Sequence, residues 1–311
     1  MKSKQIPLVK LYSGDINKPR IDEFDELPKK PEIIKHFTTM KANLTKNLNL
    51  TRIKDIVPYD QNIVQLKQPV NNVDFINASW VHIVQTSEGV YNLPILHPFL
   101  PSSMISLIIA QSSLDNTIDH HLRMTYEAKV RLVVDISQNA STNGRELFDG
   151  AIVSKTIIEI IDLNDMLTRE VWDLSKERSK TRRLVFLQLQ GWKNSKELSD
   201  VMVQNMLTTI TQARKDIGNT HETMTLLVHD DPGGVGGAAV FVALLRLLEQ
   251  IDDAVTAAKS HGGKLEDGYL TIAVLRTIHG LRCKRMVMIQ NLDQYTLLKS
   301  GKTTTILPLI R

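Results

Sequence analysis

The chain has 311 residues, 42% of them hydrophobic, and carries 38 Lys and Arg against 34 Asp and Glu, a formal net charge of +4. This length and composition are typical of a globular protein with one large domain or two small ones. The small positive charge does not argue for a nucleic-acid-binding protein or a membrane-surface protein, so we expect no nucleic-acid partner.

The single cysteine, Cys283, excludes an internal disulfide and fits a reducing compartment. Three cations adjoin it in the sequence Leu-Arg-Cys-Lys-Arg, and such neighbours lower a thiol pKa. No histidine or acid follows at the spacing of a nucleophilic dyad, so we interpret Cys283 as a structural thiol. No stretch approaches the roughly 18 consecutive apolar residues of a membrane span, and Met1–Lys10 lacks the apolar core of a signal peptide. We therefore expect a cytoplasmic segment, which can be the intracellular part of a longer membrane receptor.

The first half of the chain predicts an arm, a helix and several strands. Residues 1–20 are predicted to form a flexible arm, and the polar stretch continues to about residue 30 with a helical turn around Glu23–Leu27. The further elements expected are a helix over 31–50, strands at 62–66 and 73–85, a Gly- and Pro-containing looped insertion at 86–104, a helix over 117–129 that buries Leu122, Met124 and Tyr126, and a strand at Val130–Ile136.

The second half is richer in helical patterns. The elements expected there are strands at 151–161 and 183–190, an amphipathic helix over 197–217, a strand at 224–228, and helices over 238–251, 267–280 and 291–299. Strands come mainly first and helices later, which predicts an α/β fold with a twisted mixed sheet flanked by helices.

The most informative segment is 228–239, Val-His-Asp-Asp-Pro-Gly-Gly-Val-Gly-Gly-Ala-Ala. It lies between the apolar run Leu226–Val228 and a helical pattern that begins near Val240. A strand, a glycine-rich turn and a helix N-terminus form an anion-binding cradle, because free backbone N–H groups converge there with the positive end of the helix.

The spacing of this segment resembles the phosphate loop of protein tyrosine phosphatases, which reads His-Cys, five residues, Arg. Further segments are similar to motifs of that family in the same order: 55–60, 74–79, 109–114, 123–127 and 289–295. The likeness covers about residues 20–300 and is greatest to the inactive second, membrane-distal phosphatase domain of receptor-type members. It implies a single-domain phosphatase fold over residues 21–305.

The same resemblance implies that the catalytic groups are missing. The nucleophile position holds Asp230, and a carboxylate is a poorer nucleophile than a thiolate and repels a phosphate dianion. The phosphate-chelating arginine position holds Gly236. The general-acid position after Trp192 holds Asn194, and the position of the ring-stacking tyrosine holds Ile53. We therefore expect no catalytic residues.

Other family positions are retained: His229, Gln290, Gln294, Asn77 and Glu127. The resemblance implies that Gln290 and Gln294 match the glutamines that position water in active members, but here they have no phosphoenzyme to hydrolyse. We therefore interpret Gln290, Gln294, Asn77 and Glu127 as structural groups. His229 has two interpretations, a catalytic base or a buried structural histidine, and the second is preferred. Asp230 also has two: a vestige without a role, or a built-in anion that fills the cradle.

The resemblance predicts an inactive phosphatase-like domain with a regulatory or scaffolding role, whose partners are proteins, among them a catalytic phosphatase domain of the same receptor. An alternative is an active or residually active tyrosine phosphatase. A remote alternative is a dinucleotide-binding domain, because 234–239 fits G-x-G-x-x-A.

No cofactor and no metal are expected. His120 and His121 are adjacent in sequence and make a poor metal site with Asp119. The basic run 176–183 is interpreted as a solvated loop face.

Overall fold

The computed structural model describes residues 20–27, 35–81, 105–137, 154–164, 167–176, 181–189, 208–210, 224–260 and 269–299, with residues 29, 32 and 212. Its strands are β1 (Ile63–Val70), β2 (Val73–Trp80), β3 (Ile105–Gln111), β4 (Val130–Asp135), β5 (Ser154–Asn164), β6 (Leu167–Ser175), β7 (Arg182–Leu189) and β8 (Met224–Asp230). Its helices are α1 (Arg20–Glu26), α3 (Ile118–Glu127), α6 (Gly237–Ser260), α7 (Tyr269–Arg282) and α8 (Leu292–Lys299), with short 3₁₀ helices at Thr45–Leu50 and Asp115–Thr117.

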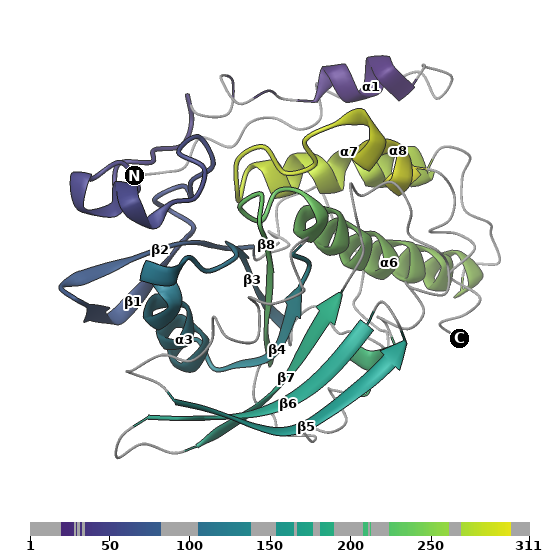
Figure 1. Ribbon diagram of the computed structural model, residues 1–311. Helices are drawn as coiled ribbons and strands as arrows, with labels where there is room; N and C mark the ends of the chain where they lie inside the picture. Colours follow the sequence, from purple (N-terminus) through teal and green to yellow (C-terminus); the bar gives the residue numbers. More distant parts are fainter. Residues whose placement is uncertain are drawn as a thin grey trace.

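The strands form one mixed sheet in the order β1-β2-β3-β8-β4-β7-β6-β5 (Figure 1). The four central strands β3, β8, β4 and β7 are parallel, and the outer pairs are antiparallel. Leu226, Leu227 and Val228 of β8 are at most 1% exposed, as expected for a central strand covered on both faces. The predicted α/β fold with a mixed sheet and flanking helices is therefore confirmed.

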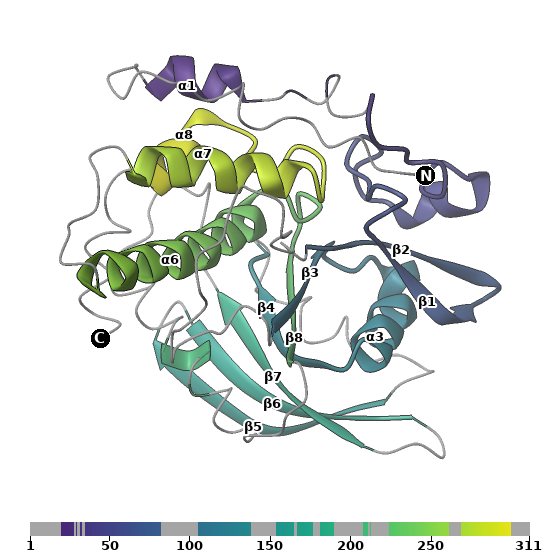
Figure 2. The same ribbon diagram turned by 180° about the vertical axis from the view of Figure 1, so that it is seen from behind.

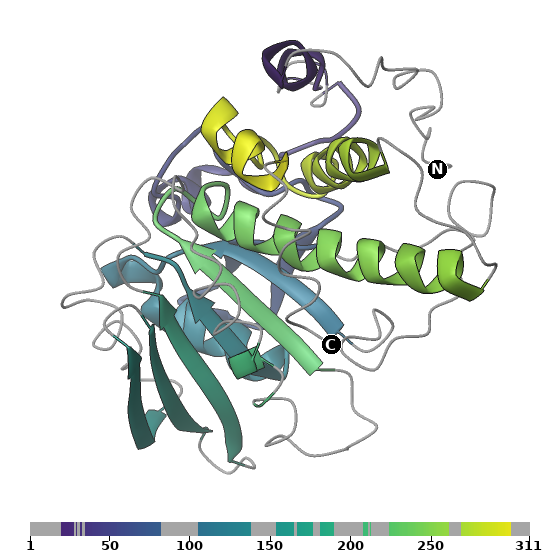
Figure 3. The same cartoon turned by 90° about the vertical axis from the view of Figure 1, so that its right-hand side faces the viewer.

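Helices cover the two faces of the sheet unequally. Helices α6, α7 and α8 lie on one side, and α3 lies on the other (Figures 2 and 3). Apolar residues of α6 and α7 share one core cluster with the strands, and Leu122, Met124 and Tyr126 of α3 share a second one with Trp172 and Phe186. The predicted buried face of the 117–129 helix is thus correct.

Parallel central strands bring their carboxyl ends to one edge, where open α/β sheets place their sites. Gln111 at the end of β3 is in register with Asp230 of β8, and Asp135 at the end of β4 is in register with His229. The loop after β8 therefore starts between two neighbouring strand ends.

Three sequence predictions need correction. Residues 31–50 are not one helix: the described part has turns and the 3₁₀ helix Thr45–Leu50. The backbone N–H groups of Met40 and Lys41 donate to the Asp60 carboxylate at 2.8 and 2.9 Å and not to carbonyls one turn earlier. Strands β3 and β6 were not predicted.

Some predicted features lie outside the described residues. They are the arm at 1–20 except for Arg20, the insertion at 86–104 and most of the helix at 197–217. Of the 197–217 helix, Thr208–Ile210 and Gln212 are described as helical, and Ile210 is buried. Within the described part of the chain, no helix is long and apolar enough to cross a membrane.

Candidate functional site

The loop between β8 and α6 is tight because two glycines allow its backbone to approach the sheet. Gly233 and Gly234 have φ of +85° and +78°, a conformation that L side chains rarely adopt. A Cβ atom on Gly234 would lie 2.8 Å from the carbonyl oxygen of Ala110 in β3. These constraints curl the loop into a cradle of backbone N–H groups at the start of α6.

The Asp230 side chain lies inside that cradle. It is 1% exposed, its Oδ1 accepts a hydrogen bond from the N–H of Gly234 at 2.5 Å, and its Oδ2 accepts one from the N–H of Ala238 at 2.9 Å. The first donor belongs to the loop and the second to the first turn of α6. This geometry favours the built-in anion over a vestige without a role.

Gly236 has no side chain to offer to an anion, and its surroundings are crowded. A Cβ atom there would lie 3.1 Å from Pro232 Cγ and 3.2 Å from Asp230 Oδ2. Its φ is not positive, because the described glycines with positive φ are Gly233 and Gly234. The space beside Gly236 is therefore occupied by Asp230 and Pro232, while its backbone is open to other residue types.

A buried cation, Arg285, supports the cradle from below. It is fully buried, and it donates to the Gly233 carbonyl from Nε at 2.9 Å and from Nη2 at 2.6 Å. It also donates to Ser79 Oγ at 2.9 Å and to Asn77 Oδ1 at 2.6 Å. Burial lowers the pKa of Arg285 to about 10, while the negative charge of Asp230 acts to raise it. One guanidinium thus joins the loop to strand β2 and faces the buried carboxylate.

Sequence reasoning missed this role of Arg285. It treated the residue only as a cation near Cys283, because arginine is rarely buried and nothing in its spacing identifies a loop support.

His229 is buried, and the contacts of its ring do not match those of a catalytic base. Its Nδ1 lies 3.2 Å from Ser112 Oγ and 3.4 Å from Asp135 Oδ1. A Ser-His-Asp relay uses one ring nitrogen for the serine and the other for the acid, whereas here both contacts involve Nδ1. The arrangement supports the interpretation of His229 as a structural histidine between β3 and β4.

The comparisons with known proteins match this architecture. The family model described as protein-tyrosine phosphatase matches residues 47–301. The chain belongs to the protein-tyrosine phosphatase family.

Its relatives include receptor-type members at low identity. The chain is 26% identical over 295 residues to receptor-type tyrosine-protein phosphatase V of Rattus norvegicus, covering 89% of this chain and 15% of that protein. It is 24% identical over 308 residues to receptor-type tyrosine-protein phosphatase alpha of Homo sapiens, covering 94% of this chain and 34% of that protein. The chain thus spans about a third or less of the length of these relatives.

A solved structure confirms the fold. PTPN18 in complex with HER2 phosphopeptides superimposes with a TM-score of 0.68 over 93% of this chain and 99% of that chain, at 18% identity. At this level of identity the likeness concerns the protein tyrosine phosphatase fold alone.

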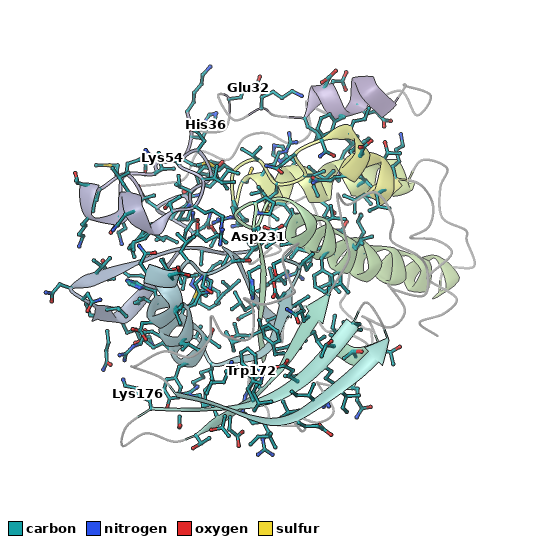
Figure 4. The ribbon with its side chains drawn as sticks, viewed as in Figure 1. Glu32, His36, Lys54, Trp172, Lys176 and Asp231 are labelled. Carbon is teal, nitrogen blue, oxygen red and sulfur yellow. The ribbon has the colours of Figure 1, made fainter. Side chains whose placement is uncertain are left out.

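The segment around Leu50 and Arg52 is tied to the end of strand β3 by the side chain of Gln111. Gln111 donates from Nε2 to the Leu50 carbonyl at 2.8 Å, and its Oε1 accepts the N–H of Arg52 at 3.0 Å. Ile53, which the sequence resemblance matches to the ring-stacking tyrosine, is 38% exposed. Arg52 Nη2 lies 4.0 Å from Asp231 Oδ1 at the start of the loop (Figure 4), so Asp231 faces the rim of the site.

Asn77 and Glu127 have structural contacts, as expected. Asn77 donates from Nδ2 to the Ile56 carbonyl at 2.8 Å, in addition to accepting from Arg285. The Glu127 carboxylate accepts the N–H groups of Lys67 at 2.7 Å and Gln68 at 3.2 Å. Both side chains join separate elements through backbone groups.

Gln290 and Gln294 lie together before and in α8. The Gln294 Oε1 accepts a hydrogen bond from the backbone N–H of Gln290 at 2.7 Å, so this side-chain oxygen binds the loop that precedes α8. The preceding loop is strained, because Val287 and Ile289 are β-branched and both have φ of 59°. Arg282 holds it by donating to the carbonyls of Met288 at 3.0 Å and Ile289 at 2.8 Å.

Asn194, which the sequence resemblance matches to the general acid, lies outside the described residues together with Trp192 and Lys193. Of the basic run, Lys176, Arg182 and Arg183 are described, and each has a partner in the chain. Lys176 donates to Gln68 at 2.6 Å, Arg182 lies over the Tyr126 ring, and Arg183 binds Asp173 through two nitrogens at 2.9 Å. These three cations of the basic run therefore contact other side chains of the same chain.

Two further sequence interpretations concern reactive or metal-binding side chains. Cys283 follows the last residue of α7 and is half-buried, and burial raises its pKa although Lys284 acts to lower it. The structure therefore does not give this thiol the lowered pKa that its neighbours suggested. His120 and His121 are both buried in α3, and among the described side chains no group of three or more His, Cys, Asp or Glu is placed to hold a metal ion.

The buried Asp230 carboxyl predicts a pH-dependent stability. Burial raises its pKa from 3.8 to about 6, although the hydrogen bonds from Ala238 and Gly234 lower it. Because the pKa of Asp230 is higher in the folded chain than in the unfolded chain, the protonated carboxyl group stabilises the fold. This contribution is complete below about pH 4 and is lost as the pH rises through about 6. Urea unfolding should show the wild-type free energy of unfolding falling by roughly 3 kcal/mol relative to Asp230→Asn between about pH 4 and about pH 7. If the difference in unfolding free energy between the wild type and Asp230→Asn does not change with pH, the raised pKa of the Asp230 carboxyl is contradicted.

Proposed function

We propose that this chain is a catalytically inactive member of its family that acts through protein interactions. One observation carries the proposal: the Asp230 carboxylate, which the resemblance assigns to the nucleophile position, accepts hydrogen bonds from the cradle's own N–H groups of Gly234 and Ala238. The donors that bind a phosphate in such a loop are therefore already engaged by the chain itself.

The chemistry of the other positions supports the same proposal. Phosphoryl transfer depends on positioning and on neutralising the negative charge of the phosphoryl oxygens. Asp230 adds negative charge, and Gly236 supplies no guanidinium. Asn194 cannot donate a proton to a leaving group as an acid does, and this step alone typically contributes about 10²–10⁴-fold. The combined loss exceeds what a phosphatase assay detects.

The role we propose is regulatory or scaffolding, within receptor tyrosine phosphatase signalling. The receptor-type relatives support this role, and the resemblance to a membrane-distal second domain points to a catalytic phosphatase domain of the same receptor as partner. The proposal includes a cytoplasmic location and a phosphatase-like domain over residues 21–305 that follows an arm at 1–20.

The two alternatives have less support. Residual phosphatase activity needs a nucleophile and a phosphate clamp, and the described cradle holds a carboxylate and a glycine in their places. A dinucleotide-binding domain needs a strand soon after the glycine-rich turn. Helix α6 instead runs to Ser260, and no described strand follows β8.

Calorimetry with oxyanions tests the occupied cradle. We expect vanadate and phosphotyrosine peptides to bind the wild-type chain no better than at millimolar concentration, because Asp230 repels them and holds the N–H donors. The matched variant Asp230→Ala frees Gly234 and Ala238, and we expect its vanadate affinity to rise by at least about tenfold. Micromolar phosphopeptide binding to the wild type, or no gain in Asp230→Ala, contradicts the proposal.

A further inference from the structure

Strand β5 is an open edge of the sheet with an unusual apolar surface. It is the last strand in the order, and β6 is its described neighbour (Figure 1). Six consecutive residues, 156–161, are exposed, so side chains on both faces of this stretch reach solvent. Four isoleucines contribute to it, with exposed fractions of 38% at Ile157, 51% at Ile158, 47% at Ile160 and 37% at Ile161. They make up half of the described exposed large hydrophobic side chains.

The opposite edge, β1, is protected in ways that β5 is not. Its sequence contains Lys67 and Pro69, and such residues block edge-to-edge pairing. The N–H groups of Lys67 and Gln68 are already bound by the Glu127 carboxylate from α3. Residues 156–161 read Thr-Ile-Ile-Glu-Ile-Ile, without lysine or proline. Strand β5 has Lys155 near its start and register shifts after Ile157 and Asp162 in its pairing with β6, but its isoleucine-rich centre lacks the proline and the carboxylate-bound N–H groups of β1. This centre therefore indicates a surface that pairs.

The single charge within this stretch does not oppose pairing. Glu159 forms an ion pair with Arg169 of β6 at 2.9 Å, so its carboxylate is neutralised by its own sheet. The charged residues that flank the isoleucines have opposite signs, Lys155 before them and Asp162 after them. In an antiparallel pair of identical strands, the start of one lies beside the end of the other, so backbone positions 155 and 162 become neighbours twice. Within one copy, the Lys155 ammonium lies over the Trp172 ring, 4.7 Å from its centroid.

We propose that β5 pairs antiparallel with β5 of a second copy of this chain and forms a two-fold dimer with one continuous sheet. The outward N–H and C=O groups of both edges bond to each other, and the isoleucines of both copies cover one another on the two faces. A second copy fits this edge because the segment is apolar in its middle and carries opposite charges at its ends. The interface is small, so the dimer is expected to dissociate at low concentration.

Sedimentation velocity on the full chain tests the proposal over a range from low to hundreds of micromolar. We expect a concentration-dependent monomer–dimer equilibrium in the wild type. The double variant Ile158→Lys/Ile160→Lys places like charges on the paired edge and should raise the dimer Kd by at least about tenfold. The matched control Met40→Lys/Leu44→Lys alters two other exposed apolar residues, 73% and 48% exposed, and should leave the Kd unchanged.

Three outcomes overturn the proposal. The first is a wild-type chain that stays monomeric at every concentration, which would leave the β5 edge to a different protein. The second is a dimer whose Kd does not change in the Ile→Lys double variant, and the third is a dimer that is lost only in the control variant. If the lysine variants do not fold, a spin label at Ile160→Cys in a Cys283→Ser background decides. A distance between the two spin labels that fits side chains on neighbouring strands supports the dimer. Absence of dipolar coupling between labels on different copies excludes it.

Discussion

Replacing Asp230 by Cys together with Gly236 by Arg is expected to give this chain measurable phosphatase turnover. The change places a thiolate at the N-terminal end of α6, where its pKa falls, and a bidentate guanidinium beside it. The cysteine also releases the N–H groups of Gly234 and Ala238, which then face the substrate phosphate. Neither single change is expected to suffice, because the thiolate needs the clamp and the clamp needs a nucleophile.

The backbone at position 236 admits an arginine, but the Pro232 ring beside it must shift by a few tenths of an ångström to make room for the new Cβ. The Gly236 backbone does not have positive φ, so a side chain there brings no backbone strain. The two closest contacts of a new Cβ are Pro232 Cγ at 3.1 Å and Asp230 Oδ2 at 3.2 Å, and the second disappears with Asp230→Cys. The arginine alone is therefore predicted to fit less well than the pair.

Adding Asn194→Asp supplies the general acid and should raise turnover by a further factor of about 10²–10⁴. Ile53→Tyr adds a ring at the exposed rim of the site, where it can stack on an aromatic substrate. Hydrolysis of para-nitrophenyl phosphate measures each step, with the single variants as controls. A folded quadruple variant without turnover means that the loop geometry has diverged as well as its side chains.

Removing Arg285 is expected to have the largest effect on stability. Arg285→Met leaves the Gly233 carbonyl, Ser79 and Asn77 without their buried donor, and it leaves the Asp230 carboxylate without its nearby cation. Breaking a buried charged network in this way typically costs about 3–5 kcal/mol. Urea or thermal unfolding at neutral pH measures the loss.

The matched control is Arg183→Met, which removes an exposed arginine that binds Asp173 through two nitrogens. Exposed pairs contribute little, so its unfolding midpoint should stay close to that of the wild type. Equal losses in the two variants, or a loss below about 1 kcal/mol for Arg285→Met, contradict the role of Arg285 as the support of the cradle.

The sequence predicted the parts of the fold that have strong local patterns. The run Leu226–Val228 reads as a buried central strand because all its residues are apolar, and the following glycines mark a turn. The periodicity after Val240 identifies α6. The position of Asp230 at the end of that strand was enough to suggest a carboxylate in the cradle.

The failures come from interactions between residues distant in sequence. The 31–50 stretch is not one helix, because Asp60 captures the N–H groups of Met40 and Lys41. Strand β6 has no apolar–polar alternation to indicate it, because charged Glu170 is buried next to Val171 and Trp172. The strand is held by its pairing with β7, where Glu170 lies opposite Phe186 and Trp172 opposite Leu184. Arg285 meets Asn77 across 208 positions of chain, so no local pattern indicates the contact.

The most direct test of the central claim is turnover of phosphotyrosine peptide by the purified wild-type chain, with Asp230→Ala as the matched control. An active family member measured in parallel shows that the assay works. We expect the wild-type chain to fold and to release phosphate no faster than buffer, as does Asp230→Ala. Turnover that co-purifies with the wild-type chain and disappears in Asp230→Ala contradicts the inactive cradle.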